Sequence, residues 1–277
     1  MTAAEAMAAA TARLRAAGVP DPARDARVLL AHAAQVDAAR VTLIAPEDIA
    51  PELEERYDHM ISLRAIRVPV SHLIGERAFY GRRFRISADV LDPRPETETL
   101  IEAALAQDFM RVLDLGTGSG CVLITLLSER PNAIGVATDL SEAACLQASA
   151  NAVMHQVADR AVIANADWFD GINGRFDLIV SNPPYLAAFE MDEVSPELRD
   201  HEPRMALTDE GDGLSAYRTI AAQAGSFLTA AGRVICEIGR DQGRDVLDIF
   251  ESQGWGMLNV LQDLDGRDRV IVARNPA

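Results

Sequence analysis

The tetrapeptide Asn182-Pro183-Pro184-Tyr185 follows an apolar run, residues 176–181, of the kind that forms a buried strand. A proline keeps the residue before it out of the helical region, so carbonyl oxygens of this turn can point into a cleft. Together with the Asn182 side-chain oxygen they offer two acceptors for one NH2 group. The lone pair of a planar amide or exocyclic amine is delocalised, and acceptors on its hydrogens return electron density to the nitrogen. The turn therefore predicts chemistry on a planar nitrogen, with Tyr185 covering the face of the planar group.

A glycine-rich turn lies upstream, where Asp114-Leu-Gly116-Thr117-Gly118-Ser119-Gly120 ends a strand-like run, residues 111–115, and opens a helix. Glycines at such a turn allow the backbone to approach a ligand closely, although a tight turn without a ligand also fits the pattern. Asp139 ends the next strand, 23 residues after Gly116, where a carboxylate can accept hydrogen bonds from ribose hydroxyls. Asp167-Trp168 ends the third strand and can supply an adenine contact and a stacking face. These positions predict a nucleotide-like cofactor.

The spacing of the glycines separates two kinds of cofactor. The dinucleotide fingerprint is G-x-G-x-x-G, whereas this loop has G-x-G-x-G with Asp114 before it. It resembles the first motif of class I S-adenosylmethionine methyltransferases. The resemblance implies that the loop lies along the methionine part of the cofactor and that residues after the second and third strands contact ribose and adenine. The cofactor-binding residues are then Gly116, Thr117, Gly118, Ser119, Gly120, Asp139 and Trp168, with Asn182 at the boundary between cofactor and acceptor.

Methyltransferases with the tetrapeptide act on adenine N6, cytosine N4 or the glutamine side chain, and other segments of the chain distinguish these acceptors. The segments are Pro93-Arg94-Pro95-Glu96-Thr97-Glu98, the tetrapeptide, His201-Glu-Pro203 with Ala206-Leu207, and Asp212-Gly213-Leu214. Their order and spacing resemble the protein-(glutamine-N5) methyltransferases that modify peptide chain release factors, the HemK/PrmC type. This chain departs from that family at Asp92, where the family usually has Ile.

The resemblance implies methylation of the glutamine amide in the Gly-Gly-Gln motif of class I release factors. Asn182 and the Pro183 carbonyl would hold the amide NH2, Pro184 would complete the turn, and Tyr185 would pack against the amide plane. The transfer is a direct displacement in which the enzyme positions the nitrogen, so neither a metal nor a nucleophilic side chain is needed. A glutamine methyltransferase for a ribosomal protein, a nucleic-acid amino-methyltransferase and a non-catalytic cofactor-binding module are the alternatives.

The pattern of helices and strands places these motifs in an α/β fold. After Pro95 helical and strand-like segments alternate, which predicts a mostly parallel sheet covered on both faces, with ligands beyond the carboxyl ends of its strands. The resemblance makes this a Rossmann-like, seven-stranded class I methyltransferase domain. We expect helices near residues 97–108, 119–130 and 141–155, and strands near 111–115, 133–138, 161–165, 176–181, 232–238, 256–261 and 269–273.

Three domain segments are predicted. Residues 1–75 form a helical bundle, with a capping box at Thr2 and prolines at positions 22 and 51 as first-turn residues. The resemblance makes this bundle the docking domain for the protein substrate. Residues 76–96 form a hairpin linker, and residues 97–277 form the methyltransferase domain. The expected apolar positions of the bundle are Leu29, Leu30, Leu43, Leu53, Met60, Ile61 and Leu63.

Charge and composition limit the partners. The net charge is -16 and the chain has no Lys, which opposes stable binding to bare nucleic acid. No apolar run is long enough to cross a membrane, so we expect a cytoplasmic protein. The three cysteines and five histidines lack metal-ligand spacing, and the cysteines are expected in the core. Nine acids between residues 186 and 212 form an acidic segment that could steer a basic partner, or could only keep a loop soluble.

Overall fold

The computed structural model describes residues 1–274, and the chain divides into two compact units. The helical unit comprises Met1–Glu76 together with Ser195–His201. The sheet unit comprises Arg77–Val194 and the chain from Glu202 onward. The short segment Ser195–His201 thus belongs with helices that precede it by more than a hundred residues, which the sequence did not predict.

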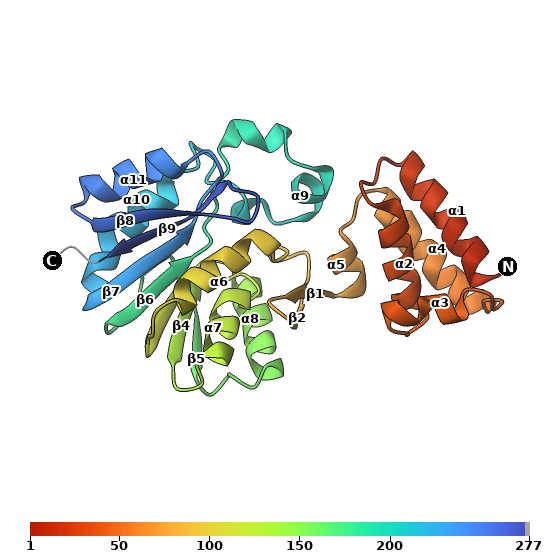
Figure 1. The fold of residues 1–277 in the computed structure, drawn as a ribbon, viewed down its shortest axis with the longest axis horizontal. Helices are drawn as coiled ribbons and strands as arrows, with labels where there is room; N and C mark the ends of the chain where they lie inside the picture. The colour runs from red at the N-terminus through yellow and green to blue at the C-terminus, as the bar shows by residue number, and fades with distance from the viewer. Residues whose placement is uncertain (275–277) are drawn as a thin grey trace. The chain divides into compact units, whose positions relative to one another are not determined.

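The helical unit consists of α1 (Ala3–Ala16), α2 (Pro22–Ala33), α3 (Val41–Ile44), α4 (Pro51–Ala65) and α5 (Val70–Ile74), with α9 (Pro196–His201) from the later segment (Figure 1). The predicted capping box is confirmed, because the Thr2 side chain accepts from Glu5 N and the Glu5 side chain accepts from Thr2 N. Prolines stand at the first positions of α2 and α4, also as predicted. Leu43, one of the expected apolar positions of the bundle, is 67% exposed and so lies outside its core.

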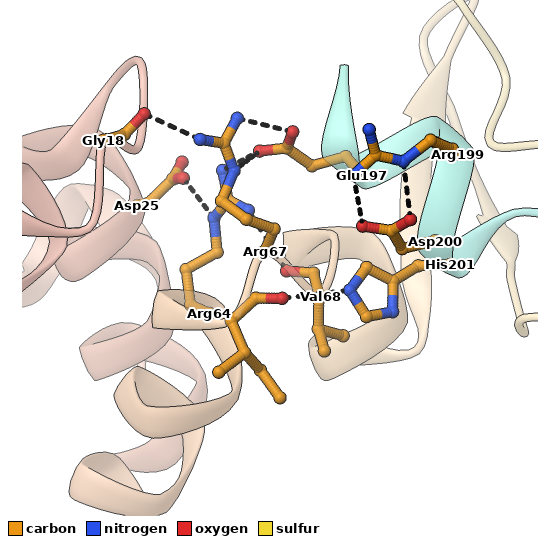
Figure 2. Close-up of polar contacts among 10 residues, drawn as sticks. Gly18, Asp25, Arg64, Arg67, Val68, Glu197, Arg199, Asp200 and His201 are labelled. Atoms are coloured by element: carbon orange, nitrogen blue, oxygen red, sulfur yellow. Dashed lines mark hydrogen bonds and ion pairs between the residues drawn. The ribbon is translucent and has the colours of Figure 1, made fainter. Parts of the chain in front are cut away.

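α9 is attached to the helical unit by charged side chains (Figure 2). Glu197 accepts hydrogen bonds from Arg67 at 2.8 and 2.6 Å and from Arg64 at 2.9 Å. Arg64 also donates to Asp25 at 2.7 Å, and both of those side chains are buried. His201 contacts the carbonyl oxygen of Ile66 at 3.1 Å. This arginine–carboxylate network gives the six-residue helix α9 a fixed place that its own length could not provide.

A hairpin of β1 (Glu76–Phe79) and β2 (Arg82–Arg85) follows the first five helices. Tyr80 and Gly81 form its turn, with φ of 46° and 71°, as the two-residue hairpin turns with primed geometry require. Phe79 and Phe84 are buried in the core of the sheet unit. The predicted hairpin is therefore confirmed.

The sheet unit is built on seven strands in the order β5-β4-β3-β6-β7-β9-β8, where β9 is antiparallel to both of its neighbours. Strand order reverses beside β3, because β4 and β5 lie on one side of it and β6 and β7 on the other. The strands are β3 (Arg111–Leu115), β4 (Ile134–Asp139), β5 (Ala161–Asn165), β6 (Phe176–Ser181), β7 (Leu228–Glu237), β8 (Gly256–Gln262) and β9 (Asp268–Arg274).

Alternate residues of the central strands enter two separate cores. Val112 packs with α6 (Glu98–Leu105), α7 (Cys121–Glu129) and α8 (Glu142–Met154) on one face. Leu113 packs with α10 (Ser215–Gln223) and α11 (Gly243–Ser252) on the other (Figure 1). Because successive side chains of a strand point to opposite faces, this division requires a sheet covered on both sides.

The predicted helices and strands are confirmed to within a few residues at their ends, and the seven-stranded, mostly parallel sheet is present. The largest difference is at β7, which begins at Leu228 rather than near residue 232. The helices of the second face, α10 and α11, are not among the helices predicted from the sequence. Cys121, Cys145 and Cys236 are buried, as expected. Among residues 1–274 no helix combines the length and apolarity needed to cross a membrane.

Candidate active site

The glycine loop and the Asn182 turn leave the sheet next to each other. Leu115 and Ser181 are paired in the parallel register of β3 and β6, and Ser181 Oγ donates to the Leu115 carbonyl at 2.7 Å. Gly116 and Asn182 are the residues that follow this pair. The structure therefore brings the two predicted motifs together at the point where strand order reverses, which is where open α/β sheets bind ligands.

Hydrogen bonds and left-handed backbone hold the glycine loop. Gly116 and Thr117 donate from their backbone N–H groups to the Thr138 carbonyl at 2.9 and 3.0 Å. Gly116, Gly118 and Gly120 have φ of 71°, 54° and 79°, a region that side chains other than glycine rarely adopt. At Gly120 a Cβ would also lie 2.9 Å from Ile124 Cδ1 and 3.0 Å from Ala148 Cβ. Gly120 is thus required for the approach of α8 to the start of α7.

The carboxylates of Asp114 and Asp139 accept hydrogen bonds from the glycine loop. Asp114 is buried, and its Oδ2 accepts from Thr117 Oγ1 at 2.7 Å and from Leu123 N at 3.3 Å. Burial raises the pKa of Asp114 to about 7. Asp139 accepts from Gly118 N at 2.8 Å and from Ser141 N at 2.9 Å, and burial raises its pKa as well. Each Asp139 oxygen keeps a further lone pair, so this carboxylate can accept ribose hydroxyls while it supports the loop.

A cavity of about 410 Å³ lies above these residues, within the sheet unit. The glycine loop from Gly116 to Ser119, Asp139 and Trp168 line one part of it, and Asn182 and Pro184 line another. Gly120 is absent from the lining and acts through packing alone. Pockets for small ligands commonly have volumes of about 300–1,000 Å³. All the predicted cofactor residues except Gly120, together with Asn182 and Pro184 of the acceptor turn, therefore share one cavity of suitable size.

Asn182 presents an oxygen that the protein leaves unsatisfied. Its Nδ2 donates to Thr97 Oγ1 at 3.3 Å, whereas its Oδ1 is buried and has no hydrogen-bond partner in the part of the chain that the structure describes. A buried polar atom without a partner costs about 1–3 kcal/mol, so an unsatisfied acceptor at the cavity wall indicates a ligand with a donor. A substrate NH2 group is such a donor.

Pro183 and Tyr185 do not line the cavity. Pro183 is buried, and the Tyr185 ring packs against the core on the face of α10 and α11. The Tyr185 carbonyl accepts a hydrogen bond from Gln242 Nε2 at 2.8 Å. Burial raises the pKa of the Tyr185 phenol. The contacts expected of the Pro183 carbonyl and of the Tyr185 ring with an acceptor amide stay predictions.

The chain after the tetrapeptide folds back against it. Leu186 N donates to the Leu207 carbonyl and Ala188 N to the Gly211 carbonyl, both at 2.9 Å. The Asp209 carboxylate accepts from the N–H groups of Gly211, Gly213 and Ser215 at 2.8, 2.9 and 3.0 Å. Against the effect of burial, the Ser215 side chain and the backbone N–H donors hold the Asp209 pKa at about 2. This folding explains why the segments around residues 201–214 accompany the tetrapeptide, and it places residues 203–206 at the cavity.

The residue that departs from the family has compensating partners. Asp92 is buried and forms an ion pair with Arg77 at 3.6 Å. Its backbone N–H donates to Glu202 at 3.3 Å, and Glu202 also pairs with Arg94. The Pro93-Arg94-Pro95 segment is thereby joined to Glu202. Arg94 and Glu96 do not line the cavity, whereas Pro93 and Thr97 do.

The acidic segment is partly neutralised within the protein. Five of its nine carboxylates pair with arginine, so less charge is available to steer a basic partner than the sequence suggests. Two more accept from backbone N–H groups, which leaves their charge in place. The seven are Glu190, Glu197, Asp200, Glu202, Asp209, Glu210 and Asp212.

The chain is similar to known methyltransferases over most of its length. The PrmC N-terminal domain model matches residues 5–75, and the methyltransferase small domain model matches residues 86–215. A release factor glutamine methyltransferase from Cereibacter sphaeroides is 54% identical over 277 residues, which covers the whole of both chains. A second from Rhodospirillum rubrum is 41% identical, over 96% of this chain and 82% of the relative. The crystal structure of a methyltransferase from Pyrococcus furiosus has a TM-score of 0.56 at 16% identity, covering 72% of this chain and 92% of that one.

The glycine loop follows β3 and the Asp139 carboxylate ends β4 of the seven-stranded sheet. This arrangement defines a class I S-adenosylmethionine-dependent methyltransferase. The cavity, the open backbone at Gly116 and Gly118 and the Asp139 carboxylate fit the amino-acid and nucleoside parts of that cofactor. At 54% identity over its full length, the chain belongs to the release factor glutamine methyltransferase family.

Proposed function

We propose that this enzyme methylates the side-chain amide nitrogen, N5, of the glutamine in the Gly-Gly-Gln motif of class I peptide chain release factors. Bound S-adenosylmethionine supplies a sulfonium methyl, whose carbon–sulfur bond breaks as the amide nitrogen bonds to the carbon, giving N5-methylglutamine, S-adenosylhomocysteine and a proton. The observation that supports the proposal is that Asn182, whose buried Oδ1 has no hydrogen-bond partner in the described chain, lines the same cavity as the glycine loop.

Asn182 Oδ1 accepts one hydrogen of the glutamine NH2 in this proposal, and the Pro183 carbonyl accepts the other. Both acceptors fix the amide plane and favour positive charge on the attacking nitrogen, which is how a positioned dipole lowers a barrier. Tyr185 covers the face of the amide. Asp139 and Trp168 hold the ribose and adenine, and the glycine loop holds the methionine part.

The helical unit docks the release factor in this proposal. Its support is the PrmC N-terminal domain model over residues 5–75, together with one relative that bears the release factor name and is similar to this chain over the whole of both chains. We assign residues 1–75 to docking, 76–96 to the linker and 97–277 to methyl transfer.

Incubation of the full-length protein with labelled S-adenosylmethionine tests the proposal. The acceptors are a class I release factor, the same factor with glutamine of its Gly-Gly-Gln motif changed to glutamate, ribosomal protein fractions and total nucleic acid. Mass spectrometry should find one added methyl on the Gly-Gly-Gln peptide and none on the glutamate variant. Label that enters a ribosomal protein or a nucleic acid, with the release factor unmodified, would overturn it.

A further inference from the structure

Thr97 lies beneath the Asn182 side chain, at the end of the 3-10 turn η2 (Pro95–Thr97). It is 1% exposed, it lines the cavity, and its Oγ1 accepts the hydrogen bond from Asn182 Nδ2 at 3.3 Å. The two residues are 85 positions apart in the sequence. Thr97 thus contacts the side of the Asn182 amide that faces away from the unsatisfied oxygen.

Glu237 provides the second contact of Thr97. It is the last residue of β7 and is 1% exposed. Burial raises the pKa of Glu237, and the neighbouring Thr97 side chain acts in the opposite direction, in favour of the ionised form. Glu237 Oε2 is buried and has no hydrogen-bond partner within the described part of the chain, so the carboxylate offers an acceptor to which the Thr97 hydroxyl can donate.

The Thr97 hydroxyl determines which end of the Asn182 amide it can bind. A threonine hydroxyl has one hydrogen, and an ionised carboxylate can only accept. When the hydrogen of Thr97 is donated to Glu237, the Thr97 oxygen can only accept from Asn182. Only the NH2 end of the Asn182 amide satisfies that acceptor, so Oδ1 must be on the opposite side. In the reverse orientation Asn182 would present a donor to a substrate NH2, which is also a donor.

We propose that Thr97 is a positioning residue for methyl transfer, which fixes the Asn182 amide so that its oxygen faces the acceptor nitrogen, with Glu237 setting the direction of the Thr97 hydroxyl. The inference rests on the proposed function, since it assigns a task to a residue beside the same acceptor. It predicts that the Thr97 hydroxyl affects the reaction rate more than the binding of either substrate.

Two substitutions separate this task from simple space filling. Thr97→Val keeps the shape of the side chain and removes the hydroxyl, and Thr97→Ser keeps the hydroxyl and removes the methyl group. Thr97→Ala replaces the valine variant if that variant does not fold. For the wild type and each variant, kcat and KM for a release factor are measured, together with the Kd for S-adenosylmethionine by calorimetry.

The expected result is a kcat about 10- to 100-fold lower in the valine variant, with KM and the cofactor Kd within about twofold of wild type. The serine variant should stay within about threefold of wild-type kcat. Wild-type kcat in the valine variant, equal losses in both variants, or a parallel loss of cofactor affinity would each overturn the inference.

Nuclear magnetic resonance of the Asn182 side-chain amide tests the same inference without any acceptor. One Asn182 NH2 hydrogen should exchange slowly with solvent in the wild type and the serine variant, and faster in the valine variant. Equal exchange in all three would contradict the positioning role. An inactive wild type whose amide still follows this pattern would instead count against the proposed acceptor alone.

Discussion

Gly213 lies against the backbone of Tyr185, the last residue of the tetrapeptide. A Cβ at position 213 would be 2.3 Å from the Tyr185 carbonyl oxygen and 3.0 Å from Ala187 N, far closer than atoms can approach. Gly213 also has a φ of 76°. The Asp212-Gly213-Leu214 segment therefore supports the tetrapeptide directly, since only glycine permits this approach.

The substitution Gly213→Ala should displace the tetrapeptide and lower kcat by about tenfold or more, because a shift of about 1 Å at a reacting group can cost about 100-fold. Gly254→Ala is a matched control, since Gly254 has a φ of 80° but no atom within 4 Å of an added Cβ. Both variants incur backbone strain of about 1–2 kcal/mol, visible in urea unfolding. Equal activity in the two variants would show that the contact with Tyr185 does not matter.

Removal of the Asn182 amide should have the largest effect on the reaction. Asn182→Ala deletes an acceptor aimed at the nitrogen, and loss of one such hydrogen bond typically costs about 100- to 1,000-fold in rate. Single-turnover methylation of a release factor measures this loss. A rate within a few-fold of wild type would exclude the role proposed for Asn182.

Asp139 should determine cofactor affinity. Asp139→Ala removes the acceptor for Gly118 N and Ser141 N as well as the proposed acceptor for ribose. Hydrogen bonds to a charged group contribute about 1.5–3 kcal/mol each. Loss of one such bond to the ribose should therefore raise the Kd for S-adenosylmethionine by about 10- to 100-fold. Calorimetry gives the Kd, with the exposed Asp159→Ala as control. Similar affinities for the two variants would refute this assignment.

The sequence predicted the parts of the site that strand ends determine. Gly116, Asp139 and Asn182 each follow a strand of a parallel sheet, and carboxyl ends of parallel strands meet at one edge, so local patterns were sufficient. Contacts between side chains of distant segments left no such pattern. The partners of Thr97 are 85 and 140 positions away, so its role could be recognised only in the structure.

The position of α9 could not be predicted from the sequence for the same reason. A helix of six residues has too few turns to show an apolar periodicity, and its anchor, Glu197, binds Arg67 across 130 positions of sequence. The charge of the acidic segment is visible in the sequence, whereas Glu197 and Glu202 have arginine partners more than a hundred positions away, which only the folded chain brings near. Charge composition cannot distinguish a paired carboxylate from a free one.

The rate of methylation should fall as the pH falls through about 7. Burial raises the pKa of Glu237 to about 7, and protonation would let Glu237 donate to Thr97, so that Thr97 could donate to Asn182 Oδ1 and turn the amide. Glu237→Gln should alter this acidic limb, part of which belongs to Asp114 with its pKa of about 7. The charged or titratable groups that act on Glu237 or respond to it are Arg94, Glu96, Cys121, Tyr185, Tyr217 and Arg269.

Profiles of kcat against pH, with cofactor and release factor saturating, measure this limb in both proteins. The wild-type profile should level off above about pH 8, where a group with a pKa near 7 is almost fully ionised. If the acidic limbs of the two kcat profiles are identical, the pH dependence of kcat belongs to Asp114 or to the substrate. That result would contradict the role proposed for Glu237.

Stability of the helical unit should depend on Glu197 and on acid. Hydrogen bonds from Arg67 and Arg64 hold the pKa of Glu197 at about 2, below its ordinary value of 4.5. Because the pKa of Glu197 is lowered in the folded state, its ionised carboxylate stabilises the fold at a pH above 4.5, its ordinary pKa. This stabilisation is lost as the pH falls from 4.5 toward 2. Glu197→Gln should therefore destabilise the unit by about 2 kcal/mol at pH 7, discounted for partial exposure, and by progressively less toward pH 2.

Hydrogen exchange of peptides from α4 and α9 measures this local stability, because the two helices are joined through Arg64 and Glu197. Asp200→Asn is the matched control on the same helix, since Asp200 is exposed and forms its ion pair with its sequence neighbour Arg199. It should leave exchange in α4 unchanged. If Glu197→Gln and Asp200→Asn exchange alike at pH 7, the arginines do not hold α9, and the segment after the tetrapeptide must be fixed by its contacts around Asp209 instead.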